Sequence, residues 1–316
     1  MTKSLIMKIK LVADDAYLPA LMKLLSQAKK RIDILSYSFA IGSASGKLTT
    51  SSAPYQIAMK LIEIKKKHGS KIRIRLFTEG LRETNLRNRV TAKELEAVGV
   101  EVVYGSTHAK GFCIDDEFLL FGSTNLTNQS IRKNREANLL IEDKATSKEF
   151  LRYFNYLWKG GKHGGIKLRP PFLADGDFKD ALIEMVNSAK KRVDFSIYFF
   201  NHREIEAAIV EAHQRGVKVK GFIHQHGSFA LSYIRANRAT LKRMRAQGLD
   251  DLHLSVFRTF FHSKYMVIDG KEILLGTGNW LKEDVEIHPQ LYIQLSNTRL
   301  AKALLKHLDD QIENDV

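Results

Sequence analysis

Residues 108–125 read HAKGFCIDDEFLLFGSTN, and residues 262–279 read HSKYMVIDGKEILLGTGN. The two stretches share one spacing: His, one residue, Lys, four residues, Asp, six residues, Gly, then Ser or Thr, one residue and Asn. A lone His-x-Lys carries no weight, but six matched positions that occur twice in one chain are a specific signal. They indicate a duplicated functional motif.

The repeat extends upstream of both motifs. Residues 21–40 (LMKLLSQAKKRIDILSYSFA) align with residues 182–201 (LIEMVNSAKKRVDFSIYFFN) at an offset of 161. Helix-like stretches that end at glycine are followed by alternating strands, a pattern that favours an α/β fold with parallel pairing. We therefore predict two similar halves, residues 1–160 and 173–316, related by a pseudo-twofold axis. Each is expected to be a mostly parallel mixed sheet flanked by helices, with residues 161–172 as a Gly- and Pro-rich linker.

Each motif places its His and Lys two residues apart on an expected strand, so both side chains project from one face. The Ser or Thr and the Asn follow the next short strand after a turn and can return to that face. Two such half-sites, brought together between the halves, put two imidazoles, two ammonium groups and two amides in one pocket. These residues are His108, Lys110, Ser123, Asn125, His262, Lys264, Thr277 and Asn279.

This set of groups suits phosphoryl transfer. One imidazole attacks phosphorus, while the other, protonated, donates a proton to the leaving oxygen. The lysines and asparagines hold the non-bridging oxygens and stabilise the transition-state charge, so we expect neither a metal nor another cofactor. His224 and His226 have the spacing of metal ligands on one strand face, but no Cys or carboxylate of matching spacing follows them.

The paired motif resembles that of the phospholipase D superfamily, and the resemblance covers nearly the whole chain. It implies two α/β halves that meet at one active site, and a phosphohistidine intermediate that water or an alcohol resolves. The family's catalytic His, Lys and Asn fall on the six positions named above. Its motif Asp falls on Asp115 and Asp269, and both open an expected turn, so we interpret them as structural.

The resemblance also implies an acidic residue eleven positions beyond the motif Asn, which orients a catalytic histidine. Glu136 occupies this position in the first half, but the second half has Gln290. A carboxylate bonded to imidazole favours the cation, whereas an amide adds little charge stabilisation, so the two histidines should differ. Whether Glu136 serves its own half or His262 is open. The usual role of the N-terminal half in such enzymes favours His108 as the nucleophile.

The chain has 50 Lys and Arg against 35 Asp and Glu, a net charge of +15, which favours a polyanionic partner. Arg243 lies with other basic residues on an expected helix over 236–248, which either lines a groove for phosphates or is a solvated face. We assign Ser123, Thr277, Gln290 and Arg243 to substrate binding. The single cysteine, Cys113, is expected to be a buried thiol. The sequence has neither a secretory signal nor a membrane-length apolar run, which predicts a cytoplasmic protein.

We predict a metal-independent phosphodiesterase, first of all a nuclease that hydrolyses DNA or RNA. The alternative is a lipid enzyme, either a phospholipase D or a phosphatidyl transferase of the cardiolipin synthase kind. Such an enzyme is expected to carry a membrane anchor or exposed apolar loops at its pocket. A catalytically inactive nucleic-acid-binding module is a further alternative, against which the two intact motifs argue. A monomer is sufficient for one complete site, because one chain holds both half-sites.

Overall fold

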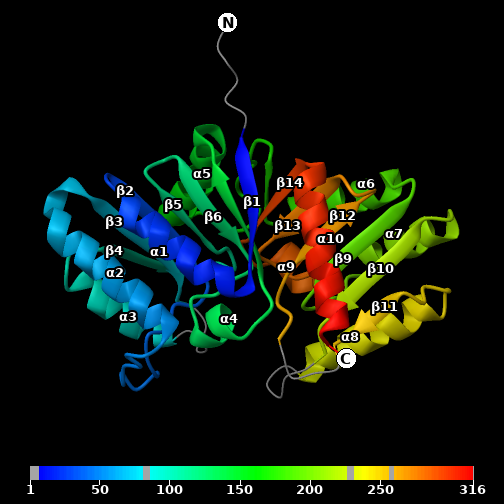
Figure 1. The fold of residues 1–316 in the computed structure, drawn as a ribbon, viewed down its shortest axis with the longest axis horizontal. Coiled ribbons are helices and arrows are strands. Elements are labelled where there is room, and N and C mark those ends of the chain that lie inside the picture. Colours follow the sequence, from blue (N-terminus) through cyan, green and yellow to red (C-terminus); the bar gives the residue numbers. More distant parts are fainter. Residues whose placement is uncertain (1–6, 81–85, 226–230, 256–259, 316) are drawn as a thin grey trace, which may run out of the picture.

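The computed structural model describes residues 7–80, 86–225, 231–255 and 260–315. They form two α/β halves that lie side by side, each built on a seven-stranded sheet with helices on its faces (Figure 1). The predicted α/β fold with two similar halves is therefore confirmed. His226 lies outside the described residues, as does Met1–Ile6 at the N-terminus.

The first half carries a sheet with the strand order β1-β7-β6-β5-β2-β3-β4. Its strands are β1 (Lys8–Ala13), β2 (Arg31–Ser36), β3 (Arg73–Glu79), β4 (Glu101–Gly105), β5 (Gly111–Ile114), β6 (Phe118–Gly122) and β7 (Ala137–Glu142). Its helices are α1 (Tyr17–Gln27), α2 (Ala53–His68), α3 (Leu86–Glu96), α4 (Asn128–Arg132) and α5 (Lys144–Trp158), with the short 3-10 helices η1 (Asp14–Ala16) and η2 (Gly69–Lys71).

The second half repeats this order, strand for strand, as β8-β14-β13-β12-β9-β10-β11. Its strands are β8 (Phe172–Ala174), β9 (Arg192–Ile197), β10 (Lys218–Ile223), β11 (Leu252–Leu254), β12 (Tyr265–Ile268), β13 (Glu272–Gly276) and β14 (Leu291–Ser296). Its helices are α6 (Asp177–Ser188), α7 (Arg203–Gln214), α8 (Leu231–Arg245), α9 (Lys282–Glu286) and α10 (Thr298–Glu313).

The sheets are mixed, but the expectation of mostly parallel strands is wrong. Parallel pairing is confined to β2-β3-β4 and β9-β10-β11, where helices connect the strands. All other strand pairs in the described sheets are antiparallel. The reason is the motif itself, because a tight turn at Asp115 or Asp269 joins its two strands as a hairpin.

Local sequence signals set the ends of the helices. Helix α2 begins where the Ser52 hydroxyl accepts a hydrogen bond from the Tyr55 N–H, with Pro54 in its first turn. Helix α7 is followed by Gly216, whose φ of 88° lies in the left-handed region that glycine adopts without strain. Cys113 lies buried on β5, as expected, and burial raises the pKa of its thiol to about 12.

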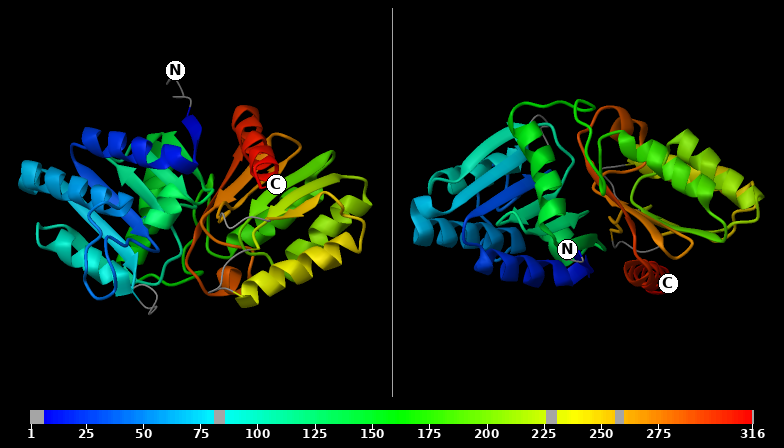
Figure 2. Two further views of the ribbon diagram at one scale, coloured as in Figure 1. Left: turned by 60° about the horizontal axis from the view of Figure 1, so that its bottom comes forward. Right: turned by 90° about the horizontal axis from the view of Figure 1, so that it is seen from above.

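The two halves are joined by a shared apolar core. Helix α5 of the first half contacts β8 of the second, and helix α10 of the second half contacts β1 of the first. Phe172 on β8, for example, packs edge-on against Phe121 of β6 with ring centroids 5.6 Å apart. Figure 2 shows the two sheets on either side of this interface. Each half therefore buries its last helix against the partner's edge strand.

Residues 159–171 connect the halves without a helix or strand of their own. This segment overlaps the predicted linker, and β8 of the second half begins at Phe172. In the described part of the chain, no helix combines the length and the apolar character needed to cross a membrane.

Candidate active site

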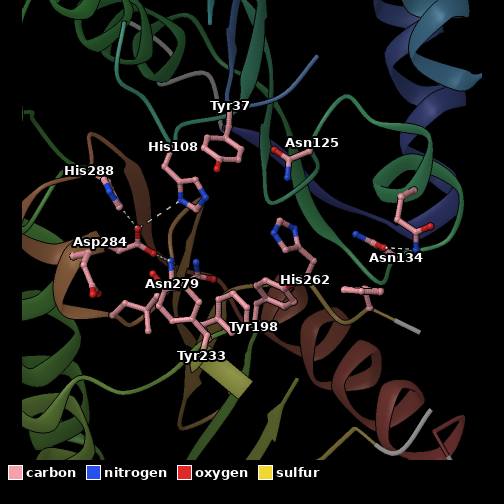
Figure 3. A pocket seen from close by; sticks show the side chains of 15 residues that line it. Tyr37, His108, Asn125, Asn134, Tyr198, Tyr233, His262, Asn279, Asp284 and His288 are labelled. Carbon is pink, nitrogen blue, oxygen red and sulfur yellow. Dashed lines mark hydrogen bonds and ion pairs between the residues drawn. The ribbon is translucent and has the colours of Figure 1, made fainter. Parts of the chain in front are cut away.

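A cavity of about 480 Å³ opens where the motifs of the two halves meet (Figure 3). Both motif histidines and both motif asparagines line it. The other lining residues are Tyr37, Gln129, Asn134, Tyr198, Phe199, Tyr233, Phe260, Leu281, Glu283, Asp284 and His288. The structure thus brings the two predicted half-sites together in one place.

Each motif histidine is held by the backbone of the opposite half. The His108 N–H donates to the carbonyl oxygen of Pro289 at 2.6 Å, and the His262 N–H donates to that of Arg135 at 2.8 Å. Both histidines are buried, with 8% of their surface exposed. These bonds cross the interface in both directions, so each half helps to position the histidine of the other.

A tyrosine supports each histidine. Tyr37 contacts the His108 ring edge-on with centroids 4.7 Å apart, and Tyr198 contacts His262 in the same way at 4.8 Å. The motif lysines lie over the same rings, with Nζ of Lys110 5.2 Å from the Tyr37 centroid and Nζ of Lys264 5.1 Å from that of Tyr198. The sequence reasoning missed both tyrosines, although they occupy identical positions in the repeat at the offset of 161.

The two motif lysines are buried cations beside the cavity. Lys110 Nζ donates to the carbonyl oxygen of His108 at 2.6 Å and, across the interface, to that of Thr277 at 3.4 Å. Lys264 Nζ donates to the carbonyl oxygen of His262. Burial holds the pKa of Lys264 well below its usual range; Glu136 opposes this shift and Lys110 adds to it. A bound anion would relieve the repulsion between the two ammonium groups.

Glu136 crosses the interface and binds the histidine of the other half. Its Oε2 lies 2.9 Å and its Oε1 3.1 Å from Nδ1 of His262. The Ser123 hydroxyl donates to Oε2 at 2.5 Å, and the Ser130 hydroxyl donates to Oε1. With a proton on Nδ1 held by this carboxylate, Nε2 of His262 is the ring nitrogen left for chemistry in the cavity.

The surroundings of the two histidines differ as a result. Burial lowers the pKa of His262 to about 4, an effect that Glu136 opposes and Lys264 strengthens. Burial and then Lys110 and Lys264 hold the pKa of His108 well below its usual range, and no carboxylate is among the main opposing groups. Nδ1 of His108 is buried without a hydrogen-bond partner among the described residues. His262 therefore has a carboxylate bonded to its ring, whereas His108 has none within hydrogen-bond distance among the described residues.

Both motif amides have unused hydrogen-bonding capacity. Oδ1 of Asn125 and Oδ1 of Asn279 are buried, and neither has a hydrogen-bond partner in the described part of the chain. Their backbones are held, since the Asn125 N–H donates to the Ser130 hydroxyl at 2.9 Å and the Asn279 N–H donates to Asp284 at 2.8 Å. The protein thus fixes the backbone of both asparagines and leaves both Oδ1 atoms without a hydrogen bond to the described residues.

The motif aspartates contact backbone and no cavity group. Oδ1 and Oδ2 of Asp115 accept the N–H groups of Lys29, Lys30 and Arg31, and Asp269 accepts those of Lys190, Lys191 and Arg192. Both aspartates adopt a positive φ, 55° and 52°. This geometry agrees with the structural role that the sequence suggests for them.

The residues assigned to substrate binding do not line the cavity. Ser123 is bonded to Glu136, and the Thr277 hydroxyl donates to the Leu291 carbonyl oxygen at 3.3 Å. Gln290 donates through Nε2 to the backbone carbonyl of Asp284. Arg243 on α8 forms two hydrogen bonds with Glu206 on α7, at 2.7 and 2.6 Å. The structure therefore gives these four side chains contacts within the protein and no place in the cavity lining.

Residues 21–158 and 182–312 match the model of the family described as "Cardiolipin synthase, PLD-like domain". The matched ranges contain both motifs and most of both halves. The chain belongs to this family within the phospholipase D superfamily.

Known proteins match parts of the chain at low identity. A stretch of 136 residues is 24% identical to the probable cardiolipin synthase YwiE of Bacillus subtilis (strain 168), covering 42% of this chain and 26% of that protein. A stretch of 121 residues is 23% identical to the mitochondrial cardiolipin hydrolase of Danio rerio, covering 38% of this chain and 51% of that one. The matches thus span about a quarter and about half of these two relatives.

Solved structures match almost the whole chain. Phosphatidylserine synthase of Haemophilus influenzae Rd KW20 superposes with a TM-score of 0.76, over 97% of this chain and 85% of that one. The sequence identity is 13%, so this likeness shows a shared fold.

Proposed function

We propose that this protein cleaves or exchanges a phosphodiester bond of a phospholipid, with His108 as nucleophile and His262 as general acid. The observation that carries the proposal is the cavity itself, which two imidazoles and two side-chain amides line together with apolar side chains. Relatives named for the synthesis and hydrolysis of cardiolipin support a lipid substrate. Phospholipid thereby takes the place of nucleic acid as our first choice.

The chemistry follows from the groups in the cavity. Nε2 of His108 attacks phosphorus, the bond from phosphorus to the leaving oxygen breaks, and His262 gives its proton to that oxygen. His262, now neutral, then takes a proton from water or an alcohol, whose oxygen displaces His108 from phosphorus. Water yields hydrolysis, and an alcohol yields transfer. In both reactions His108 returns to its free, neutral form and His262 to its protonated form.

Charge on the phosphoryl oxygens is met by four side chains. The amides of Asn125 and Asn279 lie in the cavity wall, and the ammonium groups of Lys110 and Lys264 lie beside it. Such preorganised donors stabilise the transition state without reorganisation during the reaction. They supply the positive charge that a metal ion supplies in other phosphoryl-transfer enzymes.

The assignment of roles rests on the two imidazole environments. Since the pKa of His108 lies well below its usual range, this ring is neutral near pH 7 and able to attack. The pKa of His262 is lowered as well, to about 4, but Glu136 opposes this shift and is bonded to Nδ1, so the cation that a general acid needs has a carboxylate partner at His262. A phosphodiester anion bound beside both rings raises the pKa of His262.

The apolar wall gives the cavity its fit to a lipid. Tyr198, Phe199, Tyr233, Phe260 and Leu281, all from the second half, line one side. The first half contributes Asn125, Gln129 and Asn134 to the other side. A phosphodiester held between these walls has an apolar surface for the glycerol and the first methylenes of an acyl chain on one side only.

Nucleic acid is the second candidate, and the net charge of +15 favours it. Aromatic rings such as Tyr233 and Phe199 are also suited to stacking on bases. The two substrate classes predict different binding behaviour. Affinity for nucleic acid falls steeply as the salt concentration rises, whereas affinity for a phospholipid depends on the length of its acyl chains.

Turnover assays in EDTA separate these substrates. Vesicles of cardiolipin, phosphatidylglycerol or phosphatidylethanolamine are compared with single-stranded DNA, duplex DNA and RNA, each with the His108→Ala variant as a blank. We expect headgroup release or exchange on at least one phospholipid and no cleavage of nucleic acid. Nucleic acid cleavage without lipid turnover would overturn the lipid assignment.

Phe199→Ala tests the apolar wall. We expect KM to rise roughly tenfold for a long-chain phospholipid, because buried apolar area is lost, and to change little for a small soluble aryl phosphodiester. Gln129→Ala, on the opposite wall, is the matched control. An equal effect of Phe199→Ala on both substrates would argue against acyl-chain contact.

A further inference from the structure

The second half has lost the carboxylate that the first half carries at Glu136, but it has gained one nearby. The motifs correspond at an offset of 154, which pairs Glu136 with Gln290 and Ser130 with Asp284. The second half therefore has Asp284 six positions before the place that corresponds to Glu136, on a short helix that also carries Glu283 and Glu286. The exchange raises the question of which group serves His108.

Glu136 and Asp284 are each connected to the motif asparagine of their own half. In the first half, the Asn125 N–H donates to Ser130, and Ser130 donates to Glu136. In the second half, the Asn279 N–H donates directly to Oδ2 of Asp284 at 2.8 Å. Asp284 thus combines, in one side chain, the backbone contact of Ser130 with the negative charge of Glu136.

The outer partners also correspond. Asn134 Nδ2 donates to Oε1 of Glu136 at 3.2 Å. Its counterpart in the repeat is His288, whose Nδ1 lies 2.8 Å from Oδ1 of Asp284. In both halves, a cavity-lining side chain two positions before Glu136 or Gln290 therefore holds the local carboxylate.

A third change makes room for the rearrangement. Gly278 stands where the first half has Thr124, and a Cβ at position 278 would overlap the side-chain amide of Gln290. The missing side chain leaves space for the Gln290 amide, which donates to the backbone carbonyl of Asp284 on α9. The second half thus differs from the first at positions 278, 284 and 290, and together these differences move the carboxylate from position 290 to position 284.

Asp284 faces the histidine of the opposite half. Its Oδ1 lies 4.0 Å from Nδ1 of His108, and Figure 3 shows it between His108 and His288. Asp284 is 3% exposed, and Nδ1 of His108 is buried without a hydrogen-bond partner among the described residues. The distance exceeds that of a hydrogen bond, but such contacts often tighten when substrate binds.

We infer that Asp284, held by His288, is the positioning residue of His108 and does for it what Glu136 does for His262. On substrate binding, Nδ1–H of His108 donates to Oδ1 of Asp284, which directs Nε2 at phosphorus. The two carboxylates thereby cross the interface in opposite directions. The inference rests on the proposed phosphoryl-transfer function of this site.

Four variants test the inference. Asp284→Asn keeps the shape and removes the charge, and Asp284→Ser copies the first half. Asp284→Ser with Gln290→Glu places the first-half residues at both of these positions in the second half. Glu286→Gln, which changes an exposed carboxylate on the same helix, is the matched control.

We expect Asp284→Asn and Asp284→Ser to lower kcat about 100-fold with little change in KM. Adding Gln290→Glu should restore kcat to within about tenfold of the wild type, which a role in folding alone would not produce. Glu286→Gln should match the wild type. Asp284 variants with wild-type kcat, or a double variant no better than Asp284→Ser, would overturn the inference.

A substrate-free measurement keeps this result apart from that of the proposed function. ¹⁵N NMR of histidine-labelled protein reports which ring nitrogen of His108 carries the proton. We expect an Nδ1–H tautomer in the wild type with bound orthovanadate and a tautomer mixture in Asp284→Asn. An unchanged His108 spectrum would overturn the role of Asp284. Absence of lipid turnover by the wild type would instead count against the lipid substrate.

Discussion

The turns at Asp115 and Asp269 are the same in both halves, whereas the carboxylates beside the histidines have moved. Each motif aspartate accepts three consecutive backbone N–H groups, so its two oxygens must be placed against three donors at once. The carboxylate beside a histidine needs only to place one oxygen near one nitrogen. Glu136 and Asp284 approach their histidines from different positions in the repeat. A group that holds backbone is thus less free to relocate than one that orients a side chain.

The largest effect is expected from the histidines themselves, and it separates their roles. His108→Ala and His262→Ala should each lower turnover of phospholipid by about 10⁴-fold or more. With an aryl phosphodiester, whose leaving group needs no proton, His262→Ala should accumulate a phosphorylated histidine and His108→Ala should not. The species is measured by intact-protein mass spectrometry after a rapid quench. Accumulation in His108→Ala alone would exchange the two roles.

An intermediate effect is expected from Glu136→Gln, which gives the first half the residue of the second. Turnover should fall about 100-fold, because His262 loses the group that favours its cation. A general acid must be protonated, so activity declines as pH rises through its pKa. Glu136 raises that pKa, and its removal should therefore shift the alkaline limb of the kcat profile to lower pH. An unshifted limb would mean that His262 is not the acid.

The smallest effect on catalysis is expected from substitution of the motif aspartates. Both substitutions should lower stability by the same amount. Asp115→Ala and Asp269→Ala should each lower the free energy of unfolding by about 3 kcal/mol, since three backbone N–H groups lose their acceptor. Urea unfolding measures the loss, and kcat of the folded protein at low temperature should stay near that of the wild type. A loss at one position and none at the other would contradict the equivalence of the two turns.

Much of the site could be read from the sequence because it repeats. The spacing of His108, Lys110 and Asn125 recurs at His262, Lys264 and Asn279, and one cavity collects the histidines and asparagines. Tyr37 and Tyr198 were within reach of the same reasoning. Asp284 was not, because it differs from its counterpart Ser130, and a comparison of repeats finds only what is shared. The crossing of Glu136 to His262 depends on how the halves pack, which spacing does not encode.

The prediction of mostly parallel strands was wrong because it overlooked the short turns within the motifs. Alternation of helices and strands predicts parallel neighbours, and this holds for β2-β3-β4 and β9-β10-β11. The motif strands have no helix between them, so they turn back on one another. The signal was present in the short turns at Asp115 and Asp269.

The backbone bonds that cross between the halves have a consequence for the linker. The His108 N–H is bonded to Pro289 and the His262 N–H to Arg135, so the pocket is assembled by docking and not by the connection over residues 159–171. The connection then acts as a tether, which sets the effective concentration of one half around the other. The two halves thus stay paired with each other in one chain, and each carries its carboxylate at a different position of the repeat, Glu136 in one and Asp284 in the other.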